Sequence, residues 1–444
     1  MTSYAGTGPF AGTSITDLAA RLRSGATTAA DLAEAALAAA EGTGAELNCY
    51  VTIDHAGARR AAEQADRELA AGVDRGPLHG IPVGVKDLID TAGLRTTRGS
   101  RHFAEHVPTV DADVVTALRQ AGAVIVGKTH THQFAYGPTG DVAHTGPARN
   151  PHDTSLMAGG SSSGSGAAVA AGLLPAALGT DTGGSVRIPA ALCGIVGLRP
   201  TQGAVSGAGV FPLSHTLDTV GPMAASVEDT RLLWAALTGR PVPVPVVDGL
   251  RVGVVRSSLT DQIVPSQADA LDRAVAALRK AGFAVRDEIM PDLADLGLVY
   301  ANIQGPQARA VHADRIAKSA DLYEPEVLAR LDRAAEIPAW EYVLAIERRE
   351  RARAEPPFAA EIVVLPTVPI QPPPVGARDV DLGAGWTNPM LATLSGTAGW
   401  SVLGVPAVSV PVPGDGLPGS VQLVGRAGAD SQVLAVAEAL ANLL

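Results

Sequence analysis

The sequence contains little cysteine and no long apolar run. Cys49 and Cys193 are two cysteines among 444 residues, too few for a disulfide framework. Cys193 stands in the apolar stretch 192–195 and is expected to be a small buried side chain. No segment is apolar for long enough to cross a bilayer. Residues 1–6 do not begin a basic region followed by an apolar block, as a secretory signal would. We therefore expect a cytoplasmic protein that does not enter a membrane.

Positive charge is also scarce. The formal net charge is −11 at pH 7, whereas a nucleic-acid-binding protein normally presents a basic face. We therefore expect no nucleic-acid partner; the charge does not indicate which small molecule would bind. The ordinary apolar content predicts a well-packed core. The length allows two or three domains, or one large α/β domain.

Two helix starts stand near the N-terminus. Ser14 with Asp17, and Thr28 with Asp31, have the Ser/Thr-x-x-acid spacing that is typical of helix starts. Leucine and alanine then recur at helical spacing. We predict a pair of helices here and a third helix from about residue 56 to 71.

A strand–helix–strand unit follows. The short apolar runs 81–85 and 123–126 are bounded by glycine and polar residues, which is typical of buried strands. Residues 113–120 between them have a helical pattern. Such a unit predicts a sheet that is at least partly parallel.

Glycine, serine and alanine dominate residues 159–209. Flexible linkers have a similar composition, but the alanine-rich stretch 167–171 is a strong helix former, and the apolar run 173–178 follows it at once. Small residues allow buried backbone segments to approach closely. We therefore predict that this part forms the floor of an active site.

The C-terminal half begins with a predicted strand at 250–255 and a helix at about 268–281. Residues 301–353 are mostly helical and charged. Their arginines are expected to form a solvated face; these are Arg330, Arg333, Arg348, Arg349 and Arg351. The proline-rich stretch 366–374 follows a strand-like run at 361–365. Because proline cannot occupy a central strand, we predict a rigid loop at the edge of a cleft.

Two motif matches lack the structural context that their chemistry needs. Residues 122–129 fit the phosphate-binding pattern Gly-x4-Gly-Lys-Thr, but their interior is Ala-Val-Ile-Val, which is itself the strand. Residues 102–106 fit a His-x-x-Glu-His zinc pattern that requires a continuous helix, and Pro108 follows closely. We therefore expect no metal and no cofactor. A nucleotide-dependent enzyme that uses Lys128 and Thr129 is kept as a competing interpretation.

Three further segments indicate serine chemistry. The chain has no Gly-x-Ser-x-Gly elbow and no histidine that stands out as a base, yet a nucleophilic serine needs one. Lys86 ends the apolar run 83–85, and burial there would lower its pKa from about 10.4. Ser161 and Ser185 each follow two glycines, which leave backbone N–H groups open to a substrate oxygen. Each segment alone also fits an ordinary lysine, turn or connection, but together they favour acyl transfer by a Ser–Ser–Lys relay.

These segments resemble the amidase signature family. The matching strings within 159–201 are Gly-Gly-Ser-Ser-Ser-Gly-Ser-Gly, Gly-Thr-Asp-Thr-Gly-Gly-Ser-Val-Arg-Ile-Pro-Ala and Cys-Gly-Ile-Val-Gly-Leu-Arg-Pro-Thr. The similarity extends over nearly the whole chain. The resemblance implies one large α/β domain, residues 1–444, whose mixed β-sheet core is covered by helices on both faces. The mostly helical segment from roughly 290 to 355 would be an insertion that shapes the substrate cleft.

The resemblance also implies roles for individual residues. Ser185 would be the nucleophile, Ser161 would sit on a cis peptide and pass the proton on, and Lys86 would be the final base. The oxyanion hole would use backbone N–H groups of Thr182, Gly183, Gly184 and Ser185. The supporting residues would be Ser162, Thr180, Asp181 and Arg187. The substrate-binding residues would be Gln133, Phe134 and Tyr136, although the aromatic ones also fit plain core packing.

Members of this family differ in substrate. Subunits of the glutamine-dependent tRNA amidotransferase carry an acidic residue a few positions before Thr397, where it holds the amino group of glutamine. This chain has Leu394 there, and Ser401 where an asparagine is usual. We therefore expect a free-standing amidase, a monomer or homodimer, acting on small apolar or aryl amides or carbamates. Trp386 and Trp400 would add apolar surface near the cleft. The alternative is an amidotransferase subunit that releases ammonia from glutamine for a partner protein.

Overall fold

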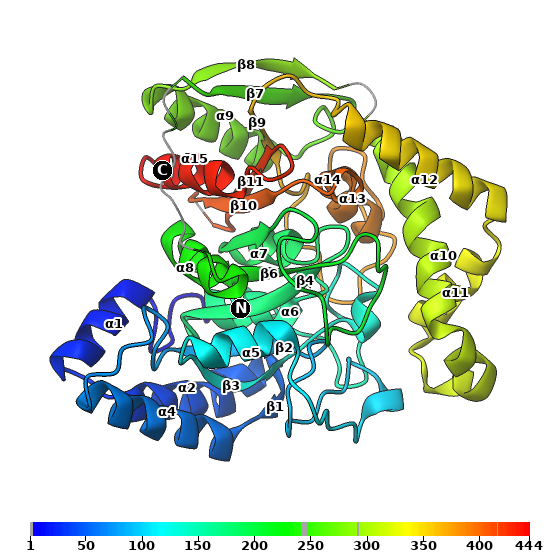
Figure 1. The fold of residues 1–444 in the computed structure, drawn as a ribbon. Helices are drawn as coiled ribbons and strands as arrows, with labels where there is room; N and C mark the ends of the chain where they lie inside the picture. The colour runs from blue at the N-terminus through cyan, green and yellow to red at the C-terminus, as the bar shows by residue number, and fades with distance from the viewer. Residues whose placement is uncertain (1–2, 241–246, 248, 291–292, 415) are drawn as a thin grey trace.

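The computed structural model describes residues 3–240, 247, 249–290, 293–414 and 416–444. Within these residues, eleven strands form one mixed sheet in the order β1-β3-β2-β4-β6-β5-β10-β11-β9-β7-β8 (Figure 1). The strands are β1 (Tyr50–Ile53), β2 (Pro82–Lys86), β3 (Val124–Thr129), β4 (Ala176–Asp181), β5 (Val196–Arg199), β6 (Thr219–Ala224), β7 (Arg251–Arg256), β8 (Ala284–Ile289), β9 (Ile362–Pro366), β10 (Ala407–Val412) and β11 (Gly419–Gly425).

Helices account for most of the remaining regular structure. The α-helices are α1 (Ile15–Ser24), α2 (Ala29–Glu41), α3 (Thr43–Glu46), α4 (His55–Ala70), α5 (Asp113–Gln120), α6 (Ser163–Ala170), α7 (Arg187–Cys193), α8 (Val227–Thr238), α9 (Pro265–Lys280), α10 (Leu293–Ser319), α11 (Pro325–Ala335), α12 (Ala339–Ala354), α13 (Pro389–Ser395), α14 (Ala398–Leu403) and α15 (Asp430–Ala441). The short 3₁₀ helices are η1 (Arg101–Phe103), η2 (Gln133–Ala135) and η3 (Ala320–Leu322).

Helices cover both faces of the sheet, as the side chains of β6 illustrate. Successive side chains of a strand point to opposite faces. Val220 and Ala224 join the main core cluster, which includes side chains of α8, α9 and α15. Met223 instead packs with residues of α6 and α7. This arrangement confirms the predicted α/β class, with one mixed sheet between helices.

The predicted elements before the active-site region are confirmed. Ser14 and Thr28 both form complete capping boxes at the starts of α1 and α2. Helix α5 connects β2 to β3, and these two strands pair in parallel. The stretch rich in small residues is not a linker, because α6 and α7 are buried in the core. None of the helices in the described residues is long and apolar enough to cross a membrane.

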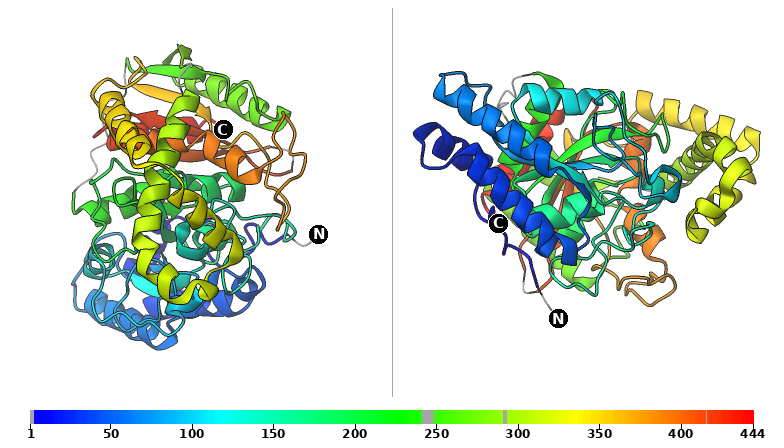
Figure 2. Two further views of the ribbon diagram at one scale, coloured as in Figure 1. Left: turned by 90° about the vertical axis from the view of Figure 1, so that its right-hand side faces the viewer. Right: turned by 90° about the horizontal axis from the view of Figure 1, so that it is seen from below.

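Helices α10, α11 and α12 form an outer layer at one side of the molecule (Figures 1 and 2). Helix α10 packs against α11, α12 and α14. The predicted solvated face is wrong for two of its five arginines: Arg349 is buried and Arg330 is half-buried. Arg349 lies four residues after the buried Ala345, so both point from one face of α12 toward the protein.

Candidate active site

Lys86 stands at the end of β2, an interior strand of the sheet, and its side chain is fully buried. Its Nζ donates to Ser161 Oγ at 2.7 Å, to Thr180 Oγ1 at 2.8 Å and to Ser162 Oγ at 2.9 Å. Burial holds the pKa of Lys86 well below its usual value, although Asp181 and Asp218 act in the opposite direction. The site therefore favours a neutral amine.

A salt bridge with the neighbouring Asp87 is the simplest ordinary use for such a lysine, and the structure does not form it. The Asp87 carboxylate instead accepts hydrogen bonds from the backbone N–H of Thr97, at 3.0 Å, and from its hydroxyl, at 2.5 Å. In the described part of the chain, no carboxylate lies within ion-pair distance of Lys86 Nζ. Its hydrogen-bonding partners are hydroxyl groups and the Thr180 carbonyl.

Ser161 and Ser162 precede α6, and the Gly160–Ser161 peptide bond is cis, as the resemblance implies. The Ser161 carbonyl accepts a hydrogen bond from the His132 backbone at 3.1 Å. The Ser162 backbone N–H donates to the Ser185 carbonyl at 3.2 Å. This last bond joins the two serine-bearing segments directly, although 24 positions separate Ser161 from Ser185 in the sequence.

Ser185 lies between β4 and α7 and retains 7% of its surface exposed. In the described residues, its hydroxyl has no hydrogen bond to the hydroxyl of Ser161. Catalytic hydrogen bonds are often long in the free enzyme and tighten when the substrate binds. The structure thus brings Lys86, Ser161 and Ser162 into contact, and it places Ser185 beside them with an open hydroxyl.

The backbone N–H groups around Ser185 are not equivalent. Gly184 has φ +136°, and its N–H donates to Asp181 Oδ1 at 2.9 Å. A buried carboxylate needs such donors, and the place of Gly184 in the oxyanion hole stays a prediction. Within the described residues, the N–H groups of Thr182, Gly183 and Ser185 have no acceptor.

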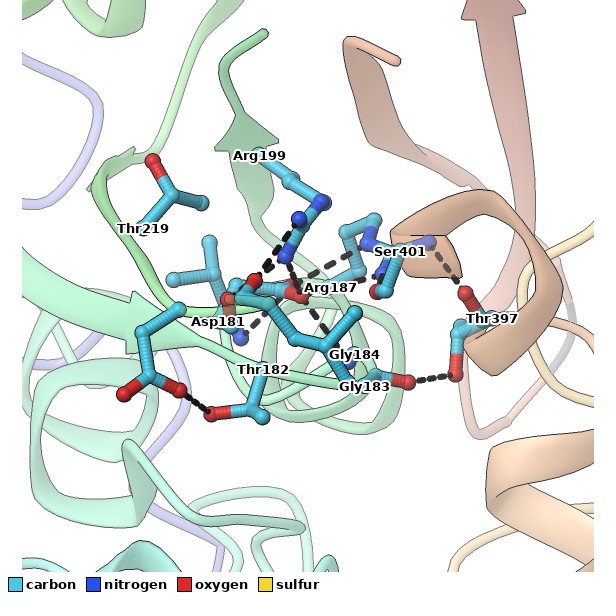
Figure 3. A network of polar contacts seen from close by, with 12 residues as sticks. Asp181, Thr182, Gly183, Gly184, Arg187, Arg199, Thr219, Thr397 and Ser401 are labelled. Carbon is cyan, nitrogen blue, oxygen red and sulfur yellow. Dashed lines mark hydrogen bonds and ion pairs between the residues drawn. The ribbon is translucent and has the colours of Figure 1, made fainter. Parts of the chain in front are cut away.

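Asp181 is the centre of a network of polar contacts around this loop (Figure 3). Its carboxylate accepts from Arg187 Nη2 and Arg199 Nη1, each at 3.0 Å, and all three side chains are fully buried. Burial alone would raise the pKa of Asp181, but the two guanidinium groups and the N–H donors outweigh it and lower the pKa. Arg187 also donates to the Thr397 carbonyl and to Ser401 Oγ, each at 3.0 Å. The support predicted for Asp181 and Arg187 thus reaches from β4 to α14.

The predicted substrate-binding residues have different surroundings. Tyr136 lines a large cavity. Phe134 is fully buried in an aromatic cluster, with its ring centroid 4.5 Å from that of His312. Gln133 bonds Ser100 Oγ at 3.2 Å and the Glu324 backbone at 2.9 Å. Plain packing therefore accounts for Phe134, and Gln133 joins neighbouring segments.

Two cavities lie near the site. The Tyr300 cavity, of about 420 Å³, is lined mainly by α10, α11 and α13, and its residues include Tyr136, Tyr300, Arg330, Arg333, Ile337 and Leu394. The Phe211 cavity, of about 380 Å³, is lined mainly by the segment 202–220, and its residues include Thr180, Thr182, Val210, Phe211, Leu213 and Asp218. Trp386 and Trp400 line neither; Trp400 is fully buried in the core, contrary to the prediction that it adds surface near the cleft.

Sequence reasoning missed several residues that hold the site together. Thr397 Oγ1 donates to the Gly183 carbonyl at 2.6 Å, and Thr182 Oγ1 donates to Asp218 Oδ1 at 2.6 Å. A Cβ added to Gly183 would lie 2.5 Å from Tyr300 Cζ, so this ring lies directly against the loop. Arg199 lies in one of the strings that resemble the amidase signature family, so the sequence could have indicated its role. Tyr300 lies within a helix and gave no signal in the sequence.

The two rejected motifs lie in a strand and in a short turn. Residues 124–129 are strand β3, and the buried Lys128 donates to the Ile89 carbonyl and to Thr91 Oγ1, which argues against the nucleotide-dependent alternative. Burial lowers the pKa of Lys128 to about 8. Residues 101–103 form a single 3₁₀ turn, not a continuing helix. Among the described residues, no three His, Cys, Asp or Glu side chains are grouped as metal ligands.

Comparison with known proteins agrees with this fold. The chain is 34% identical to a glutamyl-tRNA(Gln) amidotransferase subunit of Roseiflexus sp. (strain RS-1), over 96% of this chain and 95% of that protein. It is 36% identical to AtzE, a 1-carboxybiuret hydrolase subunit of Pseudomonas sp. (strain ADP), over 91% of this chain and 92% of that protein. A crystal structure of an amidase superposes with a TM-score of 0.90 at 34% identity, covering 97% of this chain and 100% of that one.

The fold is of the α/β class, and together with these relatives it indicates an enzyme family that hydrolyses C–N bonds. The family model described as Amidase matches residues 31–434, so the chain belongs to the amidase signature family.

Proposed function

We propose that this amidohydrolase cleaves the C–N bond of small apolar or aryl amides or carbamates by a Ser–cis-Ser–Lys relay and an acyl-enzyme. The observation that carries the proposal is the setting of Lys86. Its amine is fully buried, and it contacts Ser161 Oγ at 2.7 Å with no carboxylate partner in the described residues. A neutral amine in this position can accept a proton, as a base for a serine must.

In the first stage, Ser185 Oγ attacks the carbonyl carbon. Its proton passes to Ser161 while the Ser161 proton passes to Lys86. The negative charge that develops on the carbonyl oxygen is held by the N–H groups of Thr182, Gly183 and Ser185, which have no other acceptor in the described structure. The Gly184 N–H, which is the fourth predicted donor, contacts Asp181 Oδ1 in this structure.

In the second stage, the C–N bond breaks and the leaving nitrogen takes a proton back through Ser161. The acyl group stays on Ser185 Oγ. Water then attacks the acyl carbonyl, gives its proton to the same relay and releases the acid. A carbamate differs from an amide by one ester oxygen on the carbonyl, so the same groups serve both substrates.

The Tyr300 cavity supports a small substrate with an apolar acyl part. Its walls include Leu298, Ile337, Leu391 and Leu394, and Arg330 and Arg333 lie at its side. None of its described lining residues is Asp or Glu. The helical segment α10–α12 supplies much of this wall, in line with its proposed role in shaping the cleft.

The alternative, a subunit of an amidotransferase, draws its support from the glutamyl-tRNA(Gln) amidotransferase relatives. Glutamine carries an ammonium group that needs a negatively charged or hydrogen-bond-accepting partner. The described wall of the Tyr300 cavity has no Asp or Glu for that ammonium, and Leu394 lies where those relatives are expected to carry an acid. Its two arginines would suit the carboxylate of glutamine as well as another acid. These features favour the free-standing amidase, with a monomer or homodimer as the expected state.

A release assay tests the proposal. The purified chain is offered aryl anilides, aryl carbamates, short primary amides and glutamine, with Ser185→Ala as the blank. We expect hydrolysis of the apolar substrates that Ser185→Ala abolishes. Hydrolysis confined to glutamine, and increased by a partner protein, would favour the amidotransferase alternative. Release that persists undiminished in Ser185→Ala would remove the proposed nucleophile.

A further inference from the structure

The two cavities meet the segment 182–185 from different sides. Thr182 lines the Phe211 cavity, whereas Tyr300, whose ring lies against Gly183, lines the other. Likewise, Ala135 lines the Phe211 cavity, and the next residue, Tyr136, lines the Tyr300 cavity. The described linings share no residue. The loop that carries Ser185 therefore lies between the two spaces, although neither described lining includes Ser185 itself.

The two cavities also differ in charge. Arg330 and Arg333 line the Tyr300 cavity, and its described lining contains no carboxylate. The Phe211 cavity contains the carboxylate of Asp218, and its described lining contains no lysine or arginine. Hydrolysis of an amide yields an acid and an amine. An arginine-bearing wall suits the acid, and a wall without lysine or arginine suits the amine.

The proton relay lies on the side of the Phe211 cavity. Thr180 lines this cavity, and its Oγ1 accepts from Lys86 Nζ at 2.8 Å. The leaving nitrogen has to reach the relay, because it takes its proton there before it departs. The amine half of the substrate is therefore expected on the Thr180 side of the loop.

We propose that the Phe211 cavity is the binding site for the leaving amine and accepts amines that bear an apolar alkyl or aryl group. This inference rests on the proposed hydrolysis at Ser185. An apolar cavity of about 150 Å³ already holds benzene, and this one measures about 380 Å³. Val210, Phe211 and Leu213 supply apolar wall. The Asp218 carboxylate lies in the same wall and already accepts from Thr182 Oγ1 and from the Leu213 backbone N–H. Ammonia alone would leave most of this space unused.

A matched pair of substrates tests the assignment. Both carry the same acyl group; one releases ammonia and the other 4-nitroaniline. In Val210→Phe, a larger side chain enters the cavity, and we expect the kcat/KM ratio of anilide to primary amide to fall at least tenfold relative to wild type. In Leu213→Ala, which enlarges the cavity, we expect the ratio of a 2-naphthylamide to the primary amide to rise severalfold.

The control variant is Ile337→Phe in the Tyr300 cavity, which meets the acyl group common to both substrates. It should change both kcat/KM values by the same factor and leave their ratio within twofold of wild type. Ratios that stay at the wild-type value in both Val210→Phe and Leu213→Ala would overturn the assignment, as would a ratio that responds only to Ile337→Phe.

A measurement on the wild-type enzyme covers the case of a variant that does not fold. Benzylamine is added during hydrolysis, and the fraction of acyl-enzyme that it captures as the benzylamide is followed. Capture that saturates with amine concentration supports a binding site, and strictly linear capture opposes it. If wild type hydrolyses neither substrate, the proposed function itself fails, and the assignment fails with it.

Discussion

Two regions of the molecule differ in which side chains they bury. One consists of the strands and loops that carry the serines, and the other is the helical segment α10–α12. Around β2 and β4, ionisable side chains such as Lys86, Asp181 and Arg187 are fully buried, and each has hydrogen-bonding partners. Along α10 and α12, apolar side chains are exposed, with 65% of Leu298 and 61% of Trp340 open to solvent. The first region fixes ionisation states, and the second provides cavity wall and outer surface.

The difference shows where each task can be placed. A lysine stays neutral only where water is excluded, which requires small residues and close backbone contacts. Helix α6 provides this with glycine, serine and alanine throughout most of its length. Substrate selection needs no such burial, so a peripheral helical layer can perform it. Changes in the first region should therefore abolish activity or folding, and changes in the second should alter substrate preference.

The largest expected effect comes from removing the base. Lys86→Ala should lower kcat by about 10³–10⁴-fold, because residues that act as one unit fail together. Ser185→Ala should be comparably damaging. Rates on an anilide are measured beside circular dichroism, which should show an intact fold. Substantial activity in Lys86→Ala would end the relay proposal.

Next in size is the loss of the buried carboxylate. Asp181→Asn leaves Arg187 and Arg199 without a negative partner at 0% exposure. We expect the free energy of unfolding to fall by about 3–5 kcal/mol. Urea unfolding measures this change. A loss below about 1 kcal/mol would show that the other acceptors satisfy both guanidinium groups.

A smaller loss of activity is expected from a substitution at the contact between the Ser185 loop and helix α10. The Cβ of Gly183→Ala would lie 2.5 Å from Tyr300 Cζ, so the loop or the ring must shift. We expect kcat to fall about 10²-fold, as displacements near 1 Å can do. Combining it with Tyr300→Ala should restore activity to within tenfold of Tyr300→Ala alone. A double variant as inactive as Gly183→Ala would place the strain elsewhere.

The pH dependence should follow Lys86. Burial depresses its pKa, and the relay needs the neutral form. Below that depressed pKa, kcat/KM should fall about tenfold per pH unit. The unfolded chain keeps a lysine pKa of about 10.4 and so binds more protons than the folded state between the two values. Stability should therefore rise with pH in that window.

Lys86→Met is the control for this stability effect, since it removes the titrating group. Urea unfolding of both proteins between pH 6 and 10 gives the difference in unfolding free energy. That difference should shift in favour of wild type as the pH rises. A constant difference would contradict a depressed pKa.

The smallest effect is expected at the outer layer. Arg351→Ala alters an exposed position on α12. The free energy of unfolding should stay within about 0.5 kcal/mol of wild type, and kcat on the anilide should not change. A large loss of either would show that this layer contributes more than cavity wall.

Much of the fold was predictable where local signals and burial agree. The capping residues Ser14 and Thr28 mark helix starts by their own chemistry. The run that ends at Lys86 predicts a buried strand, because its residues are mostly apolar and it is bounded by glycine and polar residues. Arg330 and Arg349 were misjudged, since a long arginine on a helix can face either solvent or protein, and only the neighbouring helices decide which.

The sequence by itself determined the chemistry of this protein: which serines and which lysine are present, and that each stands among residues small enough to be buried. The tertiary structure alone decided what those groups can do. It turned the Gly184 N–H toward Asp181, set Tyr300 against Gly183, and placed two arginines in one cavity wall and Asp218 in the other. These contacts join residues more than a hundred positions apart or depend on one backbone angle, and no local pattern in a chain encodes either.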